Sequence, residues 1–179
     1  ALIRKLEGDK KSLKLLCPKK LTFFHGNFHM DNILTNGERV IFTDPRGEKI
    51  GSEDYDKIKM FVHFFIEYDA IHVGRFDFKK DMNSFKVRIT DKRVSNRYLY
   101  LQKKFLRYGL KRHKDASGYF RKMLLIGAIH ALSFSMYHAK KDVPNKERVM
   151  TYYLGAAKLL NDFFDEKNIT PKHRAFSNK

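Results

Sequence analysis

Apolar residues with the spacing of an α-helix dominate the second half of the chain. The pattern predicts a helix over 53–71 and three more over 94–113, 117–139 and 146–166. The first of these has an apolar stripe at helical spacing, formed by Ile58, Phe61, Val62, Phe65 and Ile66. Hydroxyl and carboxyl side chains precede it at residues 52–54, where they would satisfy the free N–H groups of a first turn.

Shorter segments predict β-structure. Residues 32–44 contain two short apolar runs around the dipeptide Asn36-Gly37, which allows positive φ at both turn positions and predicts a hairpin. Residues 74–91 alternate apolar and polar positions and predict a second hairpin. Residues 21–24 predict a short buried strand. The expected fold class is therefore mainly α with small β-hairpins, an α+β domain.

The two ends of the chain are more polar than the domain expected between them. Residues 1–16 predict a basic helix, with apolar contacts at Leu2, Leu6, Leu13 and Leu16. Pro171 opens a polar segment. We expect a basic helix and linker over 1–20, one domain over 21–166 and a polar tail over 167–179. The length of 179 residues and the 42% of hydrophobic residues suffice for a domain with its own core.

Charge is the outstanding feature of the composition. The chain has 37 Lys and Arg against 20 Asp and Glu, a formal net charge of +17, and residues 79–122 hold 15 of the basic residues against three Asp. This excess predicts an anionic partner: nucleic acid, a phosphosugar, a polyanionic glycan or an acidic membrane surface. The alternative is that the lysines only cover solvated faces, as in a Lys-rich proteome.

The lengths of the apolar runs and the number of cysteines indicate in which cellular compartment the chain is expected. No run approaches the ~18 apolar residues that a membrane span requires. The first twenty residues lack the apolar stretch of a signal peptide. The single cysteine, Cys17, excludes an internal disulfide and fits a reducing compartment. We expect a cytoplasmic chain without a membrane span.

The segment between Gly26 and Asp44 contains side chains suited to phosphoryl transfer. This chemistry uses a carboxylate for the attacking hydroxyl, and an amide oxygen and a second carboxylate that hold Mg²⁺ against the phosphates of a nucleotide. Asn32 begins the predicted hairpin and Asp44 ends it, so the hairpin should bring them together. Asn27 lies five residues before Asn32 on a loop to which Gly26 gives conformational freedom.

The stretches HGNFHMDNIL and IFTDPRG resemble the catalytic core of the aminoglycoside phosphotransferase and choline kinase-like group, a branch of the protein-kinase-like fold. His25 and Gly26 match the opening of its His-Gly-Asp motif, in which the His supports the loop structure. Asn32 and Asp44 match its metal-binding residues. The resemblance implies that the domain over 21–166 is the C-terminal lobe of such a kinase, with Mg²⁺ and ATP or GTP as cofactors.

A second part of the resemblance lies at the start of the next helix. Tyr55, Asp56 and Lys59 match a Tyr-Asp-x-x-Lys pattern that follows this core. In the family, the Asp supports the catalytic loop by hydrogen bonds, and the resemblance implies the same role for Asp56. The acceptors in the group are sugars, amino alcohols and aminoglycosides. The net charge argues against cationic aminoglycosides and favours an anionic sugar or another small molecule.

The sequence departs from the family pattern in two respects. Asn27 stands where the family has its catalytic Asp, and an amide can position a hydroxyl but cannot take its proton at neutral pH. Asp31 and His29 are nearby candidates for a substitute base. The residues before Lys20 could not form the N-terminal lobe that covers the nucleotide in this fold, so we expect an upstream or separate N-lobe.

Three functions remain open from the sequence. The first is a Mg²⁺-dependent phosphotransferase, in which Arg46 either contacts phosphate or substrate or pairs with Glu48 or Asp56. The second is a pseudokinase or binding module, favoured by Asn27. The third is a basic nucleic-acid-binding domain, suggested by aromatic residues interleaved with basic ones over 97–108, but no nucleic-acid motif supports it.

Overall fold

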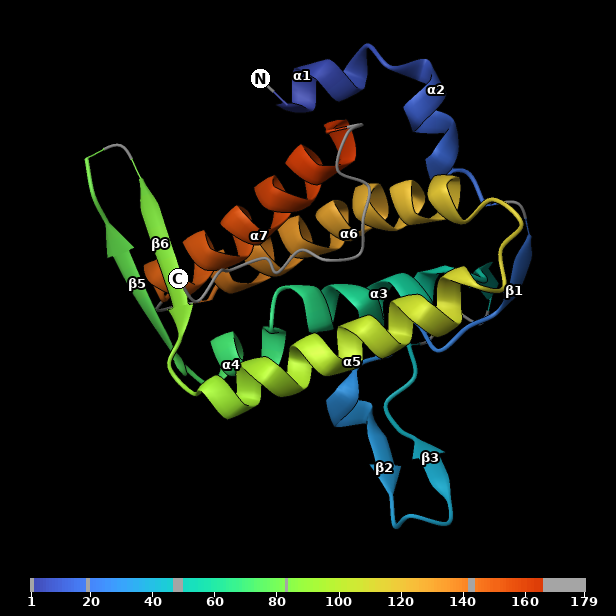
Figure 1. Ribbon diagram of the computed structural model, residues 1–179, viewed down its shortest axis with the longest axis horizontal. Coiled ribbons are helices and arrows are strands. Elements are labelled where there is room, and N and C mark those ends of the chain that lie inside the picture. The colour runs from blue at the N-terminus through green and yellow to red at the C-terminus, as the bar shows by residue number, and fades with distance from the viewer. Residues whose placement is uncertain (1, 19, 47–49, 83, 142–143, 166–179) are drawn as a thin grey trace. The chain divides into compact units, whose positions relative to one another are not determined.

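The protein is described by a computed structural model that covers residues 2–18, 20–46, 50–82, 84–141 and 144–165. Helices and three two-stranded antiparallel sheets make up the described part (Figure 1), so the expected α+β class with small strand pairs is confirmed. The chain divides into two compact units, Ala1–Phe61 and Val62–Lys179. The tail expected over 167–179 lies outside the described residues.

The N-terminal segment of unit 1 is helical but interrupted. It forms α1 (Leu2–Glu7), α2 (Lys10–Leu13) and a 3₁₀ turn over Lys14–Leu16. Asp9 lies between the two helices and starts the second, because its side chain accepts the Ser12 N–H at 3.0 Å as an N-cap. The expectation of one continuous helix over 1–16 is therefore wrong.

Four short strands form two sheets in unit 1. β1 (Leu21–Phe23) pairs with β4 (Ile50–Ser52), and β2 (Ile33–Thr35) pairs with β3 (Val40–Phe42) as the expected hairpin. The strand expected over 21–24 exists but is not buried. Leu21 and Phe23 share one face of β1, and Phe23 is 78% exposed.

The turn of the first hairpin differs from the expected geometry. Gly37 has a φ of +94°, but Asn36 is not among the positive-φ residues of the described chain. The Asn36 Oδ1 atom instead accepts the N–H groups of Glu38 and Arg39 at 3.1 and 2.9 Å. Asn36 therefore shapes the turn through the hydrogen bonds of its side chain. The expected two-residue turn would instead have relied on positive φ angles at both Asn36 and Gly37.

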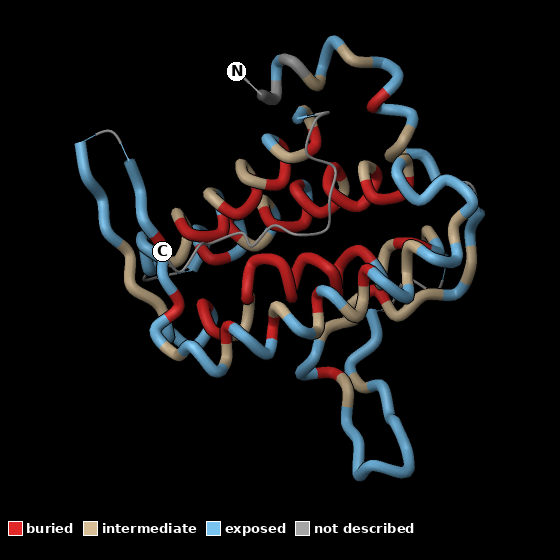
Figure 2. Tube along the Cα trace, viewed as in Figure 1, coloured by how far each residue is buried: buried red, intermediate tan, exposed pale blue. Residues whose placement is uncertain are grey.

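Three long helices and a hairpin dominate unit 2. The hairpin expected over 74–91 and the last three expected helices are present, with slightly different bounds: β5 (Phe76–Lys80), β6 (Phe85–Ile89), α5 (Lys92–Leu110), α6 (Ala116–Ala139) and α7 (Lys146–Phe164). α6 and α7 run side by side and pack together, and Figure 2 marks long buried stretches along both in red. In the part of the chain that the structure describes, no helix has both the length and the apolar character needed to cross a membrane.

The helix expected over 53–71 is divided in two. α3 (Tyr55–Phe65) ends before Glu67, and α4 (Tyr68–His72) begins after it. Glu67 has a φ of +53°, which breaks the helical path, and its buried carboxylate accepts the Ser95 hydroxyl at 3.2 Å. The pattern of apolar residues continues through the break, so the sequence does not reveal it.

A stack of aromatic rings lies in the core of unit 2. The His138 ring lies 5.1 Å from the ring of Tyr152, and both residues are buried. Burial lowers the pKa of His138 to about 4, and the neighbouring charges of Lys141, His72 and Arg148 act in the same direction. The folded protein therefore holds this imidazole neutral at pH values at which an unfolded chain would protonate it.

Acid should destabilise unit 2 through His138. The folded pKa is lower than the unfolded value of about 6.5, so the contribution of the neutral ring is complete above pH 6.5 and is lost as the pH falls towards 4. We expect a loss of about 1–3 kcal/mol from this group over that range. Urea denaturation at pH 7 and 4.5 should show a smaller acid effect for His138→Phe than for the wild type. His113→Phe, the control, should keep the full acid effect, and an undiminished acid effect in His138→Phe would contradict the prediction.

Candidate functional site

The loop after β1 is held by a single carboxylate. Asp56, in the first turn of α3, accepts the His25 N–H with Oδ2 at 2.6 Å and the Gly26 N–H with Oδ1 at 2.8 Å. Hydrogen bonds to a charged acceptor are stronger than neutral ones. Asp56 therefore fixes the backbone of the loop just before Asn27, which is the geometry that a loop-supporting residue requires.

Gly26 allows the close approach of a second segment to this loop. Its φ is +74°, and a Cβ atom there would lie 2.9 Å from the Cβ of Arg46. The Arg46 N–H donates to the His25 carbonyl at 2.8 Å. A side chain at position 26 would therefore both strain the backbone and push away the segment that carries Asp44.

The first hairpin brings Asn32 and Asp44 to the same end. The Thr43 N–H donates to the Asn32 carbonyl at 3.0 Å, and Asp44 is the next residue. Asp44 has a φ of +55°, in the left-handed region that costs a non-glycine residue free energy. Asn32 is buried and Asp44 is exposed.

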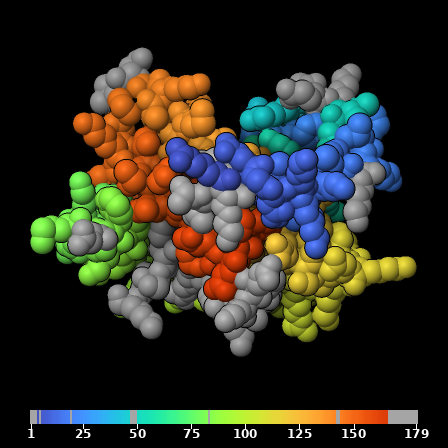
Figure 3. Space-filling view, turned by 90° about the horizontal axis from the view of Figure 1, so that it is seen from above, coloured from blue at the N-terminus to red at the C-terminus, as the bar shows by residue number. Residues whose placement is uncertain are grey.

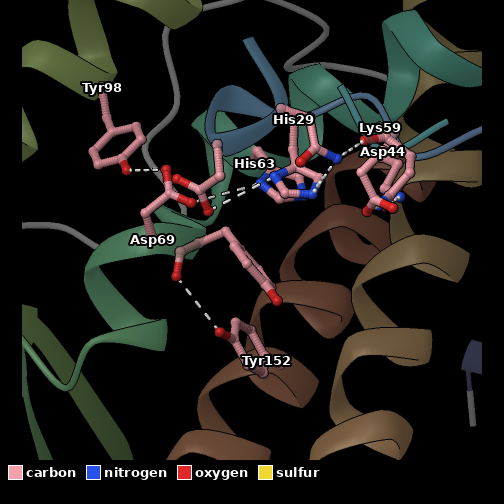
Figure 4. Close-up of polar contacts among 11 residues, drawn as sticks. His29, Asp44, Lys59, His63, Asp69, Tyr98 and Tyr152 are labelled. Carbon is pink, nitrogen blue, oxygen red and sulfur yellow. Dashed lines mark hydrogen bonds and ion pairs between the residues drawn. The ribbon is translucent and has the colours of Figure 1, made fainter. Parts of the chain in front are cut away.

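Asn27 lies between these two side chains. Its Nδ2 donates to Oδ2 of Asp44 at 2.6 Å. Its backbone carbonyl accepts a hydrogen bond from Nδ2 of Asn32 at 2.8 Å. The structure thus brings together three residues that the sequence singles out. Asp44 and Lys59, a further member of this cluster, are labelled in Figure 4.

Lys59 is the member of the site whose position the sequence does not predict. It is only 4% exposed, and its Nζ donates to Oδ1 of Asn27 at 2.7 Å and to the Gly26 carbonyl at 3.3 Å. Burial, together with the charge of Arg46, lowers the pKa of Lys59 to about 8, although Asp56 and Asp44 act in the opposite direction. The sequence places Lys59 in a motif, but only the fold shows that it reaches position 27.

The other candidates occupy the edges of the site. The Nδ1 of His25 accepts the Asn27 N–H at 3.3 Å, so its ring supports the loop. His29 has Nε2 3.1 Å from Nδ2 of Asn32 and Nδ1 3.8 Å from Asp31, which places this pair of residues on the Asn32 side of the site. The Arg46 side chain is exposed. Glu48, one of the two partners expected for Arg46, lies outside the described residues.

Asn32 and Asp44 each offer a side-chain oxygen of the type that magnesium prefers. The Oδ1 atoms of Asn32 and Asp44 accept none of the hydrogen bonds found among the described residues, and both are hard oxygen donors. Magnesium commonly takes one or two protein carboxylates and completes its shell with water and phosphate oxygens. The described chain has no group of three His, Cys, Asp or Glu side chains placed to hold a metal alone.

The basic segment 79–122 spans the hairpin β5–β6 and two helices of unit 2. On the hairpin, Lys79 lies directly opposite Lys86, and Asp77 pairs with Arg88 at 2.5 Å. Figure 3 shows the side chains of this hairpin, in green, at the surface. A shallow hollow of about 570 Å³ at its base is lined by Arg75, Thr90, Asp91, Lys92 and Arg93. The positive charge of this hairpin is therefore surface charge.

Comparison of the chain with models of protein families, with curated proteins and with solved structures found no match. Function is therefore inferred from the residues and the geometry described above.

Proposed function

We propose that the chain is the C-terminal lobe of a phosphotransferase that resembles the aminoglycoside phosphotransferase and choline kinase-like group. The observation that supports this most is the pair of hydrogen bonds from the His25 and Gly26 N–H groups to Asp56. The family resemblance implies that Asp56 supports this loop, whereas the local patterns in the sequence do not predict the contact. Asn32 and Asp44, at the two ends of the hairpin, each share a hydrogen bond with Asn27 of this loop.

The reaction would transfer the γ-phosphoryl group of ATP or GTP to a hydroxyl group. Asn32 and Asp44 would hold the magnesium ion, which neutralises phosphate charge when bound. Asn27 would face the acceptor hydroxyl and orient it through Oδ1, which has a second lone pair beside the one used by Lys59. Because phosphoryl transfer depends mainly on positioning and electrostatics, some activity is compatible with an amide at this position.

The acceptor would be a small molecule or a sugar, preferably anionic. The net charge of +17 supports this choice, because it favours the approach of negative groups and disfavours cationic aminoglycosides. Arg46 extends from the turn next to Asp44 with an exposed side chain and would contact phosphate or acceptor. The nucleotide site would be completed by an N-lobe from an upstream segment or a separate chain.

A non-catalytic binding module is the second candidate. The observation in its favour is that both polar groups of the Asn27 side chain are engaged, Oδ1 by Lys59 and Nδ2 by Asp44. Such an arrangement is stable without an acceptor. It would bind a nucleotide or a partner without turnover.

The test is nucleotide binding and turnover by the product of the full reading frame. Isothermal titration calorimetry with MgATP and MgGTP should show binding, and Asp44→Ala should weaken it about tenfold or more because a metal ligand is lost. Glu38→Ala, which removes an exposed carboxylate in the hairpin turn, should bind as the wild type does. Consumption of ATP and GTP is then measured with a panel of sugars and amino alcohols.

The outcomes separate the two candidates. Binding that depends on Asp44, together with turnover, supports the phosphotransferase. Binding that depends on Asp44 without turnover by the wild type or by Asn27→Asp supports the binding module. If no nucleotide binds, or if Asp44→Ala binds it unchanged, the proposed phosphotransferase site is wrong.

A further inference from the structure

Lys59, Asn27 and Asp44 form a continuous chain of side-chain hydrogen bonds. Lys59 donates to Oδ1 of Asn27 at 2.7 Å, and Nδ2 of Asn27 donates to Oδ2 of Asp44 at 2.6 Å. The ends of the chain have opposite charge, and the amide lies between them.

The two ends fix which way the amide faces. An ammonium group can only donate hydrogen bonds, so the side-chain oxygen of Asn27 must face Lys59. A carboxylate can only accept them, so the side-chain nitrogen must face Asp44. A flipped amide would place donor against donor and acceptor against acceptor. Because Lys59 is buried, a water molecule cannot easily take the place of Asn27 as the hydrogen-bond acceptor of its ammonium group.

The Asn27 amide is the hydrogen-bond donor to the Asp44 side chain. Its backbone is in the left-handed region, and its side chain lies at the exposed edge of the site. In a site of this kind the charge of a cation would ordinarily hold the carboxylate in place. Here the Asn27 amide donates to it directly.

We propose that Lys59 is a positioning residue that orients the Asn27 amide, and that this amide holds Asp44 in place of a divalent cation. Position 27 then sets how strongly the site depends on metal: with Asn the amide holds Asp44, and with Asp the site requires a cation. The inference rests on the proposed function, which makes Asp44 a metal ligand. It concerns the chain without nucleotide and can be tested there.

An aspartate at position 27 would reverse the interaction with Asp44. Two carboxylates would lie where the amide nitrogen and Oδ2 of Asp44 are now 2.6 Å apart, and like charges at that distance repel. Lys59 would pair with only one of the four oxygens. A divalent cation would relieve the repulsion, because the negative charge of the ligand set increases by one.

The first experiment measures thermal unfolding of the chain with and without millimolar MnCl₂ or MgCl₂. Without metal, Asn27→Asp should melt about 3–6 °C below the wild type. Calorimetric titration should show Mn²⁺ binding to Asn27→Asp about tenfold more tightly than to the wild type. The control Asn36→Asp makes the same change of charge at the exposed hairpin turn, where the side chain acts as an acceptor, and should show neither effect.

The second experiment follows the Asn27 side-chain NH₂ protons by NMR in ¹⁵N-labelled protein. In the wild type, the proton bonded to Asp44 should be shifted downfield and exchange slowly, unlike those of exposed Asn36. Lys59→Met should move this signal towards the Asn36 position, and Lys59→Arg, which keeps the donors and the charge, should restore it. Lys57→Met is the matched control, because Lys57 lies on the same helix with its side chain 52% exposed.

Two results would contradict the proposal. If Asn27→Asp is as stable as the wild type without metal and binds Mn²⁺ no more tightly, the amide does not take the place of a cation. If the Asn27 signal is the same in Lys59→Met, Lys59 does not orient it. Neither measurement involves a nucleotide or an acceptor. A failure here therefore leaves the phosphotransferase proposal standing, and the absence of turnover would leave this inference standing.

Discussion

Replacing Asp56 by alanine is expected to lower the free energy of unfolding of unit 1 by about 2–4 kcal/mol. Both oxygens of this carboxylate accept N–H groups of the loop, from His25 at 2.6 Å and from Gly26 at 2.8 Å. Alanine leaves both donors without their acceptor. It also removes one of the two negative charges that favour the protonated form of buried Lys59. Urea denaturation measures the total loss, and hydrogen exchange at His25 and Gly26 shows whether it is local.

Asp31→Ala is the control for this variant. Asp31 has an exposed side chain, 68% accessible, and lies 3.8 Å from Nδ1 of His29. Its replacement should change the free energy of unfolding by no more than about 0.5 kcal/mol. If Asp56→Ala unfolds at the same urea concentration as the wild type, and its His25 and Gly26 amides exchange no faster, Asp56 does not hold the loop.

The parts of the fold that could be predicted are those with a local pattern. The hairpin over 32–44 and the helices α5, α6 and α7 follow from turn residues and apolar spacing within each segment. The break at Glu67 could not be predicted in this way, because it depends on a buried contact with Ser95, 28 residues away. The same holds for β4, since this strand exists through its pairing with β1.

In the candidate site, too, features with a local sequence pattern could be predicted, and contacts between distant residues could not. Asn32 and Asp44 are expected at the same end of a hairpin, and the backbone pairing places Asn32 opposite Thr43, the residue before Asp44. The contact between Asp56 and His25 joins residues 31 apart and is expected only from the family resemblance. The contact of Lys59 with Asn27 follows from neither source. Lysine on a helix is normally exposed, and nothing in the spacing of α3 indicates that this one is buried.

If the proposed phosphotransferase function holds, changing Asn27 to aspartate should raise the rate of phosphoryl transfer by about 10²–10⁴-fold. An amide can orient the attacking hydroxyl but cannot accept its proton, whereas a carboxylate can do both. Lys59, 2.7 Å from Oδ1 of Asn27, and a bound divalent cation would together offset the charge of Asp44 and keep the new carboxylate ionised, so the proton acceptor would be available. The measurement is kcat for Mg²⁺-dependent consumption of ATP or GTP, made on the full reading frame with an acceptor found in the panel.

A matched control and the other possible outcomes show whether position 27 acts as a base. Asn36→Asp adds the same charge at the hairpin turn and should leave kcat unchanged. If wild type and Asn27→Asp turn over at similar rates, position 27 orients the hydroxyl and another group takes the proton. Lys59 would then be the first residue to replace, because it is the titratable group in contact with the Asn27 side-chain oxygen. A fall in kcat for Asn27→Asp would mean that the hydrogen bond from the amide to Asp44 matters more for the reaction than a base does.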